Sequence, residues 1–361
     1  MATNFSNALL ARLGIQLPIV QGPMNGASTP AMAAAVSNAG GLGSLAVSLL
    51  APAAIESNVA ALRQQTDRPF NINLFVLDQP HADEGELQRA AALLAPIRAE
   101  LGLPPATPLS KYGENFRDQL EMLISLAVPV ASFTFGLLDA TAIERLHAAG
   151  SLVIGTATNV AEARAWADNG ADIICAQGGE AGGHRGTFIG PFEDSMIGTL
   201  ALVPQIVDAV RLPVIAAGGV MDGRGVAACL MLGAQAAQLG TAFLACAEAS
   251  IHPGWKELLR SAADTSTRTT RTFSGRPARG IVNDFMRRMA AHETELPAYP
   301  IQNALTAEIR QAAGKANRME FISLWAGQAA GMSRVRAPGI GAAELVAQLA
   351  DETHAALRRQ S

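Results

Sequence analysis

Cysteine is scarce in this chain. Its 361 residues include only Cys175, Cys229 and Cys246, and no two of them form a CxxC pair. An odd number of widely spaced thiols cannot complete a disulfide framework. We therefore expect buried, reduced cysteines in a cytoplasmic protein.

Long apolar runs and blocks of positive charge are also missing. No uninterrupted apolar run reaches about 18 residues, the length that a transmembrane helix needs. The first residues, MATNFSNALLARLG, show no basic region followed by an apolar core. Lysine and arginine are scattered along the chain, and the formal net charge is only −4. We therefore expect neither a membrane nor a nucleic acid as a partner.

Short apolar segments that alternate with helical segments are abundant. A content of 49% hydrophobic and 16% charged residues is typical of a globular protein. The order Ser28-Thr29-Pro30 can begin a helix, and Asn38-Ala39-Gly40-Gly41 can end it. The candidate strands are residues 18–22, 41–46, 70–76, 129–135, 152–156, 172–177, 213–217 and 236–239. Eight strand-and-helix repeats predict a TIM barrel, a closed α/β barrel, rather than an open doubly wound sheet.

Two segments interrupt this repeat. Residues 78–111 contain Pro104, Pro105 and Pro108 and separate the third strand from its helix. Residues 247–337 are helical in pattern. We predict that residues 1–246 and 338–361 form the barrel, and that residues 247–337 form a small helical cap over its mouth. The first insertion is expected above the same face.

A glycine-dense loop carries a histidine directly after a buried strand. The run 171–176, ADIICA, has the apolar character of a parallel strand that is covered on both faces. The loop that follows, QGGEAGGHRG, ends with His184-Arg185-Gly186. Its glycines let the backbone approach a flat ligand closely. We therefore interpret it as an active-site loop with His184 as the candidate catalytic residue.

Two further glycine turns predict a phosphate site. Gly218 and Gly219 follow the seventh candidate strand, and Gly240 and Thr241 follow the eighth. A phosphate commonly lies between these two loops of a TIM barrel. Free backbone N–H groups and the Thr241 hydroxyl can hold a dianion there.

Two amide side chains are candidates for contact with a ring. Asn73 lies on the third strand and Gln177 at the end of the sixth. Amides both donate and accept hydrogen bonds, which suits the carbonyl and N–H edge of a flavin. The alternative is that these amides only bridge backbone groups between strands.

The chain resembles the class I nitronate monooxygenases, formerly called 2-nitropropane dioxygenases. The resemblance spans nearly the whole chain. The matching motifs are QGPM at 21–24, NxF at 73–75, GGEAGGHRG at 178–186, AAGGVMDGR at 216–224, LGTAF at 239–243 and LWAGQ at 324–328. One departure is Leu77, where many members have a histidine.

The resemblance implies a bound FMN, no metal, and an enzyme that is a monomer or a homodimer. The cofactor-binding residues that it implies are Gln21, Gly22, Met24, Asn73, Gln177, Gly182, Gly218, Gly219, Gly240, Thr241, Trp325 and Gln328. Tyr112, Tyr299 and Lys315 are candidates for lining the substrate side, because they lie in or beside the two insertions.

The resemblance also implies a reaction. Alkyl nitronates, propionate 3-nitronate in particular, would be oxidised with O2 to carbonyl compounds and nitrite by one-electron transfer to the flavin. His184 would hydrogen-bond or charge-pair with the nitronate, or remove an α proton from a neutral nitroalkane. Two alternatives stay open. One is an FMN-dependent NAD(P)H:quinone or enoyl-thioester reductase, and the other is a non-catalytic barrel that binds a phosphorylated metabolite.

Overall fold

A closed parallel β-barrel forms the larger part of the protein. The computed structural model describes residues 5–358. The strands of the barrel are β1 (Ile19–Gln21), β2 (Gly43–Ala46), β3 (Phe70–Phe75), β4 (Val130–Thr134), β5 (Leu152–Ala157), β6 (Ile173–Gln177), β8 (Val214–Ala217) and β9 (Ala236–Leu239). They pair in the order β1-β9-β8-β6-β5-β4-β3-β2, and a parallel bridge between Val20 and Leu42 joins the two ends. The predicted TIM barrel and its eight strands are confirmed.

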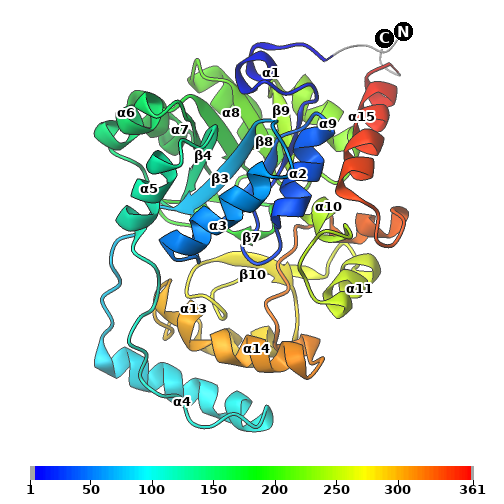
Figure 1. The fold of residues 1–361 in the computed structure, drawn as a ribbon. Coiled ribbons are helices and arrows are strands. Elements are labelled where there is room, and N and C mark those ends of the chain that lie inside the picture. Colours follow the sequence, from blue (N-terminus) through cyan, green and yellow to red (C-terminus); the bar gives the residue numbers. More distant parts are fainter. Residues whose placement is uncertain (1–4, 359–361) are drawn as a thin grey trace.

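Helices surround this barrel (Figure 1). The outer helices are α2 (Pro30–Asn38), α3 (Pro52–Arg63), α5 (Phe116–Ser125), α6 (Ala140–Ala148), α7 (Val160–Asp168), α8 (Thr199–Ala209), α9 (Gly223–Met231) and α15 (Ala342–Arg358). Local sequence sets where they begin. Thr29 caps α2 by accepting from the Met32 N–H, with Pro30 in the first turn, and Asp222 caps α9 through the Arg224 and Gly225 N–H groups.

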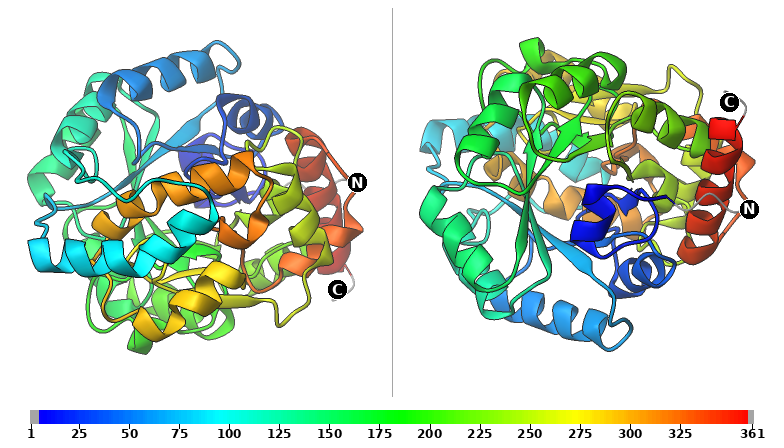
Figure 2. Two further views of the ribbon diagram at one scale, coloured as in Figure 1. Left: turned by 90° about the horizontal axis from the view of Figure 1, so that it is seen from below. Right: turned by 90° about the horizontal axis from the view of Figure 1, so that it is seen from above.

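The barrel interior is packed with side chains at the amino-terminal ends of the strands. Helix α1 (Ala8–Leu13) lies across this end, as the view from above in Figure 2 shows. Its Leu9, Leu10 and Leu13 join a buried cluster with inward-facing strand residues such as Ile173 and Ile215. This end is therefore closed by apolar packing, and the opposite end is left for a site.

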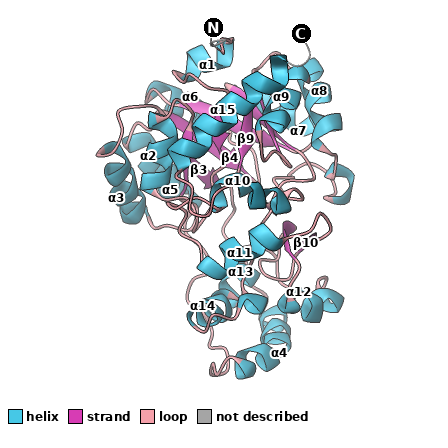
Figure 3. Ribbon diagram, turned by 90° about the vertical axis from the view of Figure 1, so that its right-hand side faces the viewer, coloured by secondary structure: helices cyan, strands magenta, loops and turns pink. Residues whose placement is uncertain are grey.

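A second layer covers the carboxyl-terminal ends of the strands (Figures 1 and 3). Its helices are α4 (Glu84–Glu100), α10 (Thr241–Leu244), α11 (Pro253–Ser261), α12 (Asp284–Met289), α13 (Ile301–Leu305) and α14 (Ala307–Lys315). Short 3₁₀ turns occur at Glu193–Ser195, Ala290–His292, Met319–Phe321 and Ala330–Val335. Leu94 and Ile97 of α4 pack with Phe273, Phe285 and Phe321, so the first insertion shares a core with the second.

The sequence pattern predicted a helical cap, but the cap also contains β-strands. Strands β10 (Thr267–Thr270) and β11 (Ala278–Ile281) pair antiparallel, and β7 (Gly183–His184) pairs with β11. Because β7 belongs to the loop after β6, this small sheet joins the barrel loop to the cap. The division at residues 247–337 stays a prediction.

Residues 5–358 contain neither a membrane-spanning helix nor a cluster of metal ligands. None of the helices there is long and apolar enough to span a lipid bilayer. Histidine, cysteine and acidic side chains do not gather there in groups that could hold a metal ion.

Candidate functional site

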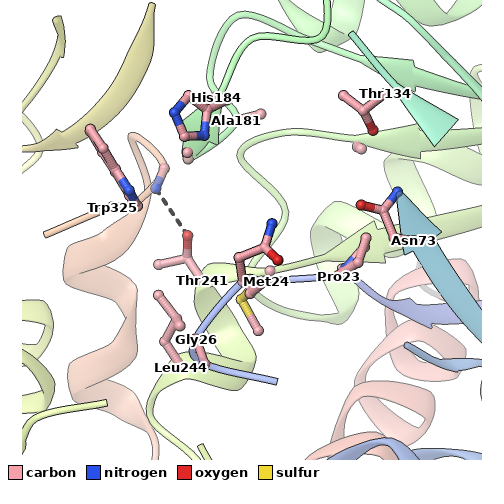
Figure 4. A pocket seen from close by; sticks show the side chains of 18 of the residues that line it. Pro23, Met24, Gly26, Asn73, Thr134, Ala181, His184, Thr241, Leu244 and Trp325 are labelled. Carbon is pink, nitrogen blue, oxygen red and sulfur yellow. Dashed lines mark hydrogen bonds between the residues drawn. The ribbon is translucent and has the colours of Figure 1, made fainter. Parts of the chain in front are cut away.

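A cavity of about 380 Å³ opens between the carboxyl-terminal ends of the strands and the cap (Figure 4). This size lies within the range of roughly 300–1,000 Å³ that is usual for small-molecule and cofactor sites. Its wall combines barrel loops with cap residues such as Tyr299 and Trp325. Among the described residues that line it, Arg310 is the only one of the Asp, Glu, Lys and Arg types.

Glycine turns form one end of the cavity. Gly218 and Gly219 have φ angles of 121° and 72°, a region that L side chains rarely adopt. A Cβ on Gly218 would lie 2.9 Å from Thr199 Oγ1, so a side chain there would also collide with the start of α8. Thr241 lies across the turn, and its Oγ1 accepts a hydrogen bond of 2.9 Å from the Gly327 N–H of the cap (Figure 4).

Both candidate amides line the cavity, and both are tied to neighbouring groups. Asn73 donates from Nδ2 to the carbonyl oxygen (3.1 Å) and the hydroxyl (3.0 Å) of Ser132. Gln177 donates to the His184 carbonyl oxygen (3.0 Å) and accepts from the Gly186 N–H (2.8 Å). Gln177 therefore shapes the histidine loop, whereas the oxygen of Asn73 faces the cavity in Figure 4.

His184 is held in a fixed orientation. Its backbone pairs with Ala278 of β11, and its Nε2 lies 2.9 Å from Ser274 Oγ. Ser274 Oγ donates its hydrogen to the Arg276 carbonyl oxygen (3.1 Å). Because a serine has one hydrogen to give, the tautomer with the hydrogen on Nε2 of His184 is the one that satisfies both contacts of Ser274 Oγ. Nδ1 is then the ring nitrogen that carries a lone pair.

Aromatic rings and arginines surround the imidazole. The rings of Phe75, Phe135, Tyr299 and Trp325 lie with their centroids 5.4–6.1 Å from that of His184. Burial, together with the charges of Arg276 and Arg310, lowers the pKa of His184 from 6.5 to about 3. His184 is therefore neutral at physiological pH. Burial likewise raises the pKa of Tyr299 to about 12, so its hydroxyl stays protonated.

Two charged residues of the histidine loop serve to hold it. Buried Arg185 donates to the carbonyl oxygens of Gln177 (3.0 Å), Gly178 (2.6 Å) and Ser195 (2.9 Å). Glu180 accepts from the N–H and hydroxyl of Thr199, both at 2.9 Å, at the start of α8. These contacts fix the loop against the barrel, and neither side chain lines the cavity.

Comparison with known proteins identifies the family. The sequence model described as nitronate monooxygenase matches residues 6–352. The chain belongs to the nitronate monooxygenase family. Proteins of Staphylococcus aureus named probable nitronate monooxygenase are 42% identical over 323 residues, which are 89% of this chain and 91% of theirs. The chain is thus an oxidoreductase related to nitronate monooxygenases.

Solved structures agree with this membership. The nitroalkane oxidase of Streptomyces ansochromogenes is 42% identical, with a TM-score of 0.89, and the match covers 98% of this chain and 100% of that one. FabK of Thermotoga maritima is 29% identical, with a TM-score of 0.77 and 98% coverage of both chains. An enoyl reductase domain of MlnA from Bacillus amyloliquefaciens, at 13% identity and a TM-score of 0.69, shares the fold.

Most of the site residues expected of a nitronate monooxygenase line the cavity. Those that line it are Gly22, Met24, Asn73, Gln177, Gly182, His184, Gly218, Gly219, Gly240, Thr241, Tyr299 and Trp325. Gln21, Gln328, Tyr112 and Lys315 do not. Gln21 is buried between strands and donates to the Ser44 carbonyl oxygen (2.9 Å). Gln328 and Lys315 are exposed, because each lies on the outer side of its turn or helix.

The structure of this family member also adds residues that the sequence reasoning missed. Phe75, Phe135 and Arg310 line the cavity, and Ser274 orients His184. Phe75 lies at the end of β3, two residues before Leu77, where side chains face the barrel mouth. The position of Phe75 within the NxF motif was the one signal that could have identified it. Arg310 had no such signal, because α14 also carries Glu308 and Lys315, and nothing in the sequence singles out one of these charged residues.

Proposed function

We propose that this member of the family binds FMN and oxidises alkyl nitronates, propionate 3-nitronate among them, with O2 to carbonyl compounds and nitrite. The observation that supports this most is that one cavity has two ends of different chemical character. One end is a glycine-turn cradle for an anion, and the other holds a neutral histidine and Arg310, the one arginine among the described residues that line the cavity. A flat redox cofactor and a small anionic substrate together match that arrangement.

The residues present fit an FMN. Gly218, Gly219, Gly240 and Thr241 would hold the phosphate through backbone N–H groups and the Thr241 hydroxyl, in a cradle that a Cβ on Gly218 would fill. Met24, Asn73 and Trp325 would contact the ring. When bound, FMN supplies the redox capacity for moving electrons from the nitronate to oxygen. The protein contributes placement and electrostatics.

His184 would act in its neutral form. Burial is the main cause of its low pKa, and the positive charges of Arg276 and Arg310, which lower that pKa as well, would also attract an anionic nitronate into the cavity. With Nε2–H committed to Ser274, Nδ1 can accept a proton or a hydrogen bond. In its neutral form His184 would therefore not form an ion pair with a nitronate. A group with a pKa of about 3 is also a weak base, so removal of an α proton from a neutral nitroalkane by His184 would be slow at neutral pH.

An anaerobic absorbance experiment tests this function. Purified protein is mixed separately with propionate 3-nitronate and with NADH. We expect a yellow protein whose flavin absorbance changes with the nitronate and stays unchanged with NADH. Rapid bleaching by NADH alone would favour the reductase alternative, and a colourless protein that binds phosphate esters would favour the metabolite-binding alternative.

A further inference from the structure

Arg310 is a charged side chain with an incomplete set of partners. It lies on α14, lines the cavity and donates from one terminal nitrogen to the carbonyl oxygen (2.7 Å) and side-chain oxygen (3.1 Å) of Asn303. Its Nε is buried without a hydrogen-bond partner. Within residues 5–358, no carboxylate forms an ion pair with it.

A guanidinium in this position costs free energy. Withdrawing an ionised group from water is unfavourable unless an opposite charge or a full set of hydrogen bonds replaces the water. The side chain is half-buried and lines the cavity. An anion in the cavity would compensate its charge, and a carboxylate matches the fork of N–H groups on an arginine.

The neighbouring arginine does not compete for this role. Arg276 also lowers the pKa of His184. However, its Nε donates to the Arg185 carbonyl oxygen (3.1 Å), and its guanidinium stacks on Phe135, 3.9 Å from the ring centroid. It does not line the main cavity. Arg276 therefore fixes the histidine loop, and Arg310 is left to contact a ligand.

We propose that Arg310 binds a second anionic group of the substrate, a carboxylate, and so selects nitronates that carry one on a short chain. This inference rests on the proposed function. Tyr299 has its ring 5.4 Å from that of His184, and it lines the same cavity as Arg310. The nitronate end would thus lie at His184 and the carboxylate end at Arg310, with the Tyr299 ring beside the chain between them.

The test compares two nitronates of similar length, propionate 3-nitronate and butyl-1-nitronate, which lacks the carboxylate. We expect Arg310→Gln to lower kcat/KM for propionate 3-nitronate roughly 10- to 100-fold, mainly through KM, because a charged hydrogen bond is lost. Butyl-1-nitronate should change less than about 3-fold. Equal losses for both nitronates, or no loss for either, would overturn the proposal.

Control variants separate this effect from misfolding. Arg287→Gln removes the same charge from an exposed position on α12 and should leave both substrates unchanged. Arg310→Lys retains a cation and should keep part of the preference for the carboxylate, even if Arg310→Gln fails to fold. A lysine variant that folds and shows no preference would also contradict the proposal.

Binding of butyrate to the purified holoenzyme, followed by tryptophan fluorescence, gives a readout without turnover. We expect Arg310→Gln to bind butyrate at least about 10-fold more weakly than the wild type, and neutral butanamide equally. Equal butyrate binding by both proteins would refute the carboxylate site. A wild type that binds butyrate but oxidises neither nitronate would instead refute the proposed function.

Discussion

At the scale of single residues, the charge state of His184 is the sharpest expectation. Burial and two arginines place its pKa at about 3, against 6.5 in water. The imidazole should therefore stay neutral from about pH 8 to about pH 5, with its hydrogen on Nε2. Because the unfolded chain takes up this proton first, the folded state should lose stability as the pH falls from 6.5 towards 3. Histidine ¹⁵N chemical shifts measure the charge and the tautomer of His184. A pKa near 6.5 for His184 in the folded protein would contradict the expectation.

Ser274 can be tested through the tautomer that it sets. Ser274→Ala removes the acceptor of the His184 Nε2–H group, which lies 2.9 Å away. We expect kcat to fall about 10-fold or more with the flavin content unchanged, because the imidazole ring loses its fixed orientation. Ser274→Thr keeps the hydroxyl and should retain most of the activity. Full activity of the alanine variant would show that Ser274 has no part in positioning His184.

These residues differ in how far the sequence could predict them. His184 lies in a local pattern, a glycine-rich loop after a buried strand, and such patterns can be recognised in one sequence. Ser274 acts on it from 90 positions away, and Arg310 reaches the cavity from a helix of ordinary composition. Lys315, five positions further along the same short segment, was predicted instead, because the direction in which a cap helix presents its side chains depends on tertiary packing.

At the scale of elements, α4 should depend on the cap for its stability. Leu94 and Ile97 lie in the cap cluster, and Arg98 forms an ion pair of 2.7 Å with Glu308 of α14. We expect Leu94→Ala to lower the free energy of unfolding by about 2–5 kcal/mol, since it leaves a cavity in a packed cluster. Gln88→Ala changes an exposed position of α4 and should have little effect. Chemical denaturation measures the free energy of unfolding of both variants. Equal values for the two would mean that α4 is not anchored through Leu94.

The elements of the barrel were predictable, and those of the cap were only partly so. Each barrel strand is a short apolar run covered on both faces, so its signal is contained in its own residues. Strand β10 (Thr267–Thr270) is polar, β11 (Ala278–Ile281) is a four-residue segment that contains an arginine and a glycine, and β7 is two residues long. Their identity as strands comes from pairing between segments that are distant in the sequence. Periodicity within one segment cannot report such pairing.

For the whole molecule, the contact between barrel and cap should control whether a cofactor is retained. Gly182 of the histidine loop lies against the cap, and a Cβ there would be 2.5 Å from both the Ala326 carbonyl carbon and the Gly327 nitrogen. Both are backbone atoms, so the cap would have to move away. We expect Gly182→Ala to break the bond from Gly327 N–H to Thr241 Oγ1 and to weaken flavin retention at least about 10-fold.

Gly314→Ala provides the matched control for this experiment. Gly314 lies within α14, and the nearest atom to an added Cβ is Ile322 Cδ1 at 3.8 Å, an ordinary contact. An alanine in a helix is favoured over glycine, so this variant should be as stable as the wild type or slightly more stable. Flavin content after gel filtration measures retention in both proteins. If Gly182→Ala keeps its flavin as the control does, then the loop tolerates separation from the cap, and the cofactor is held by the barrel alone.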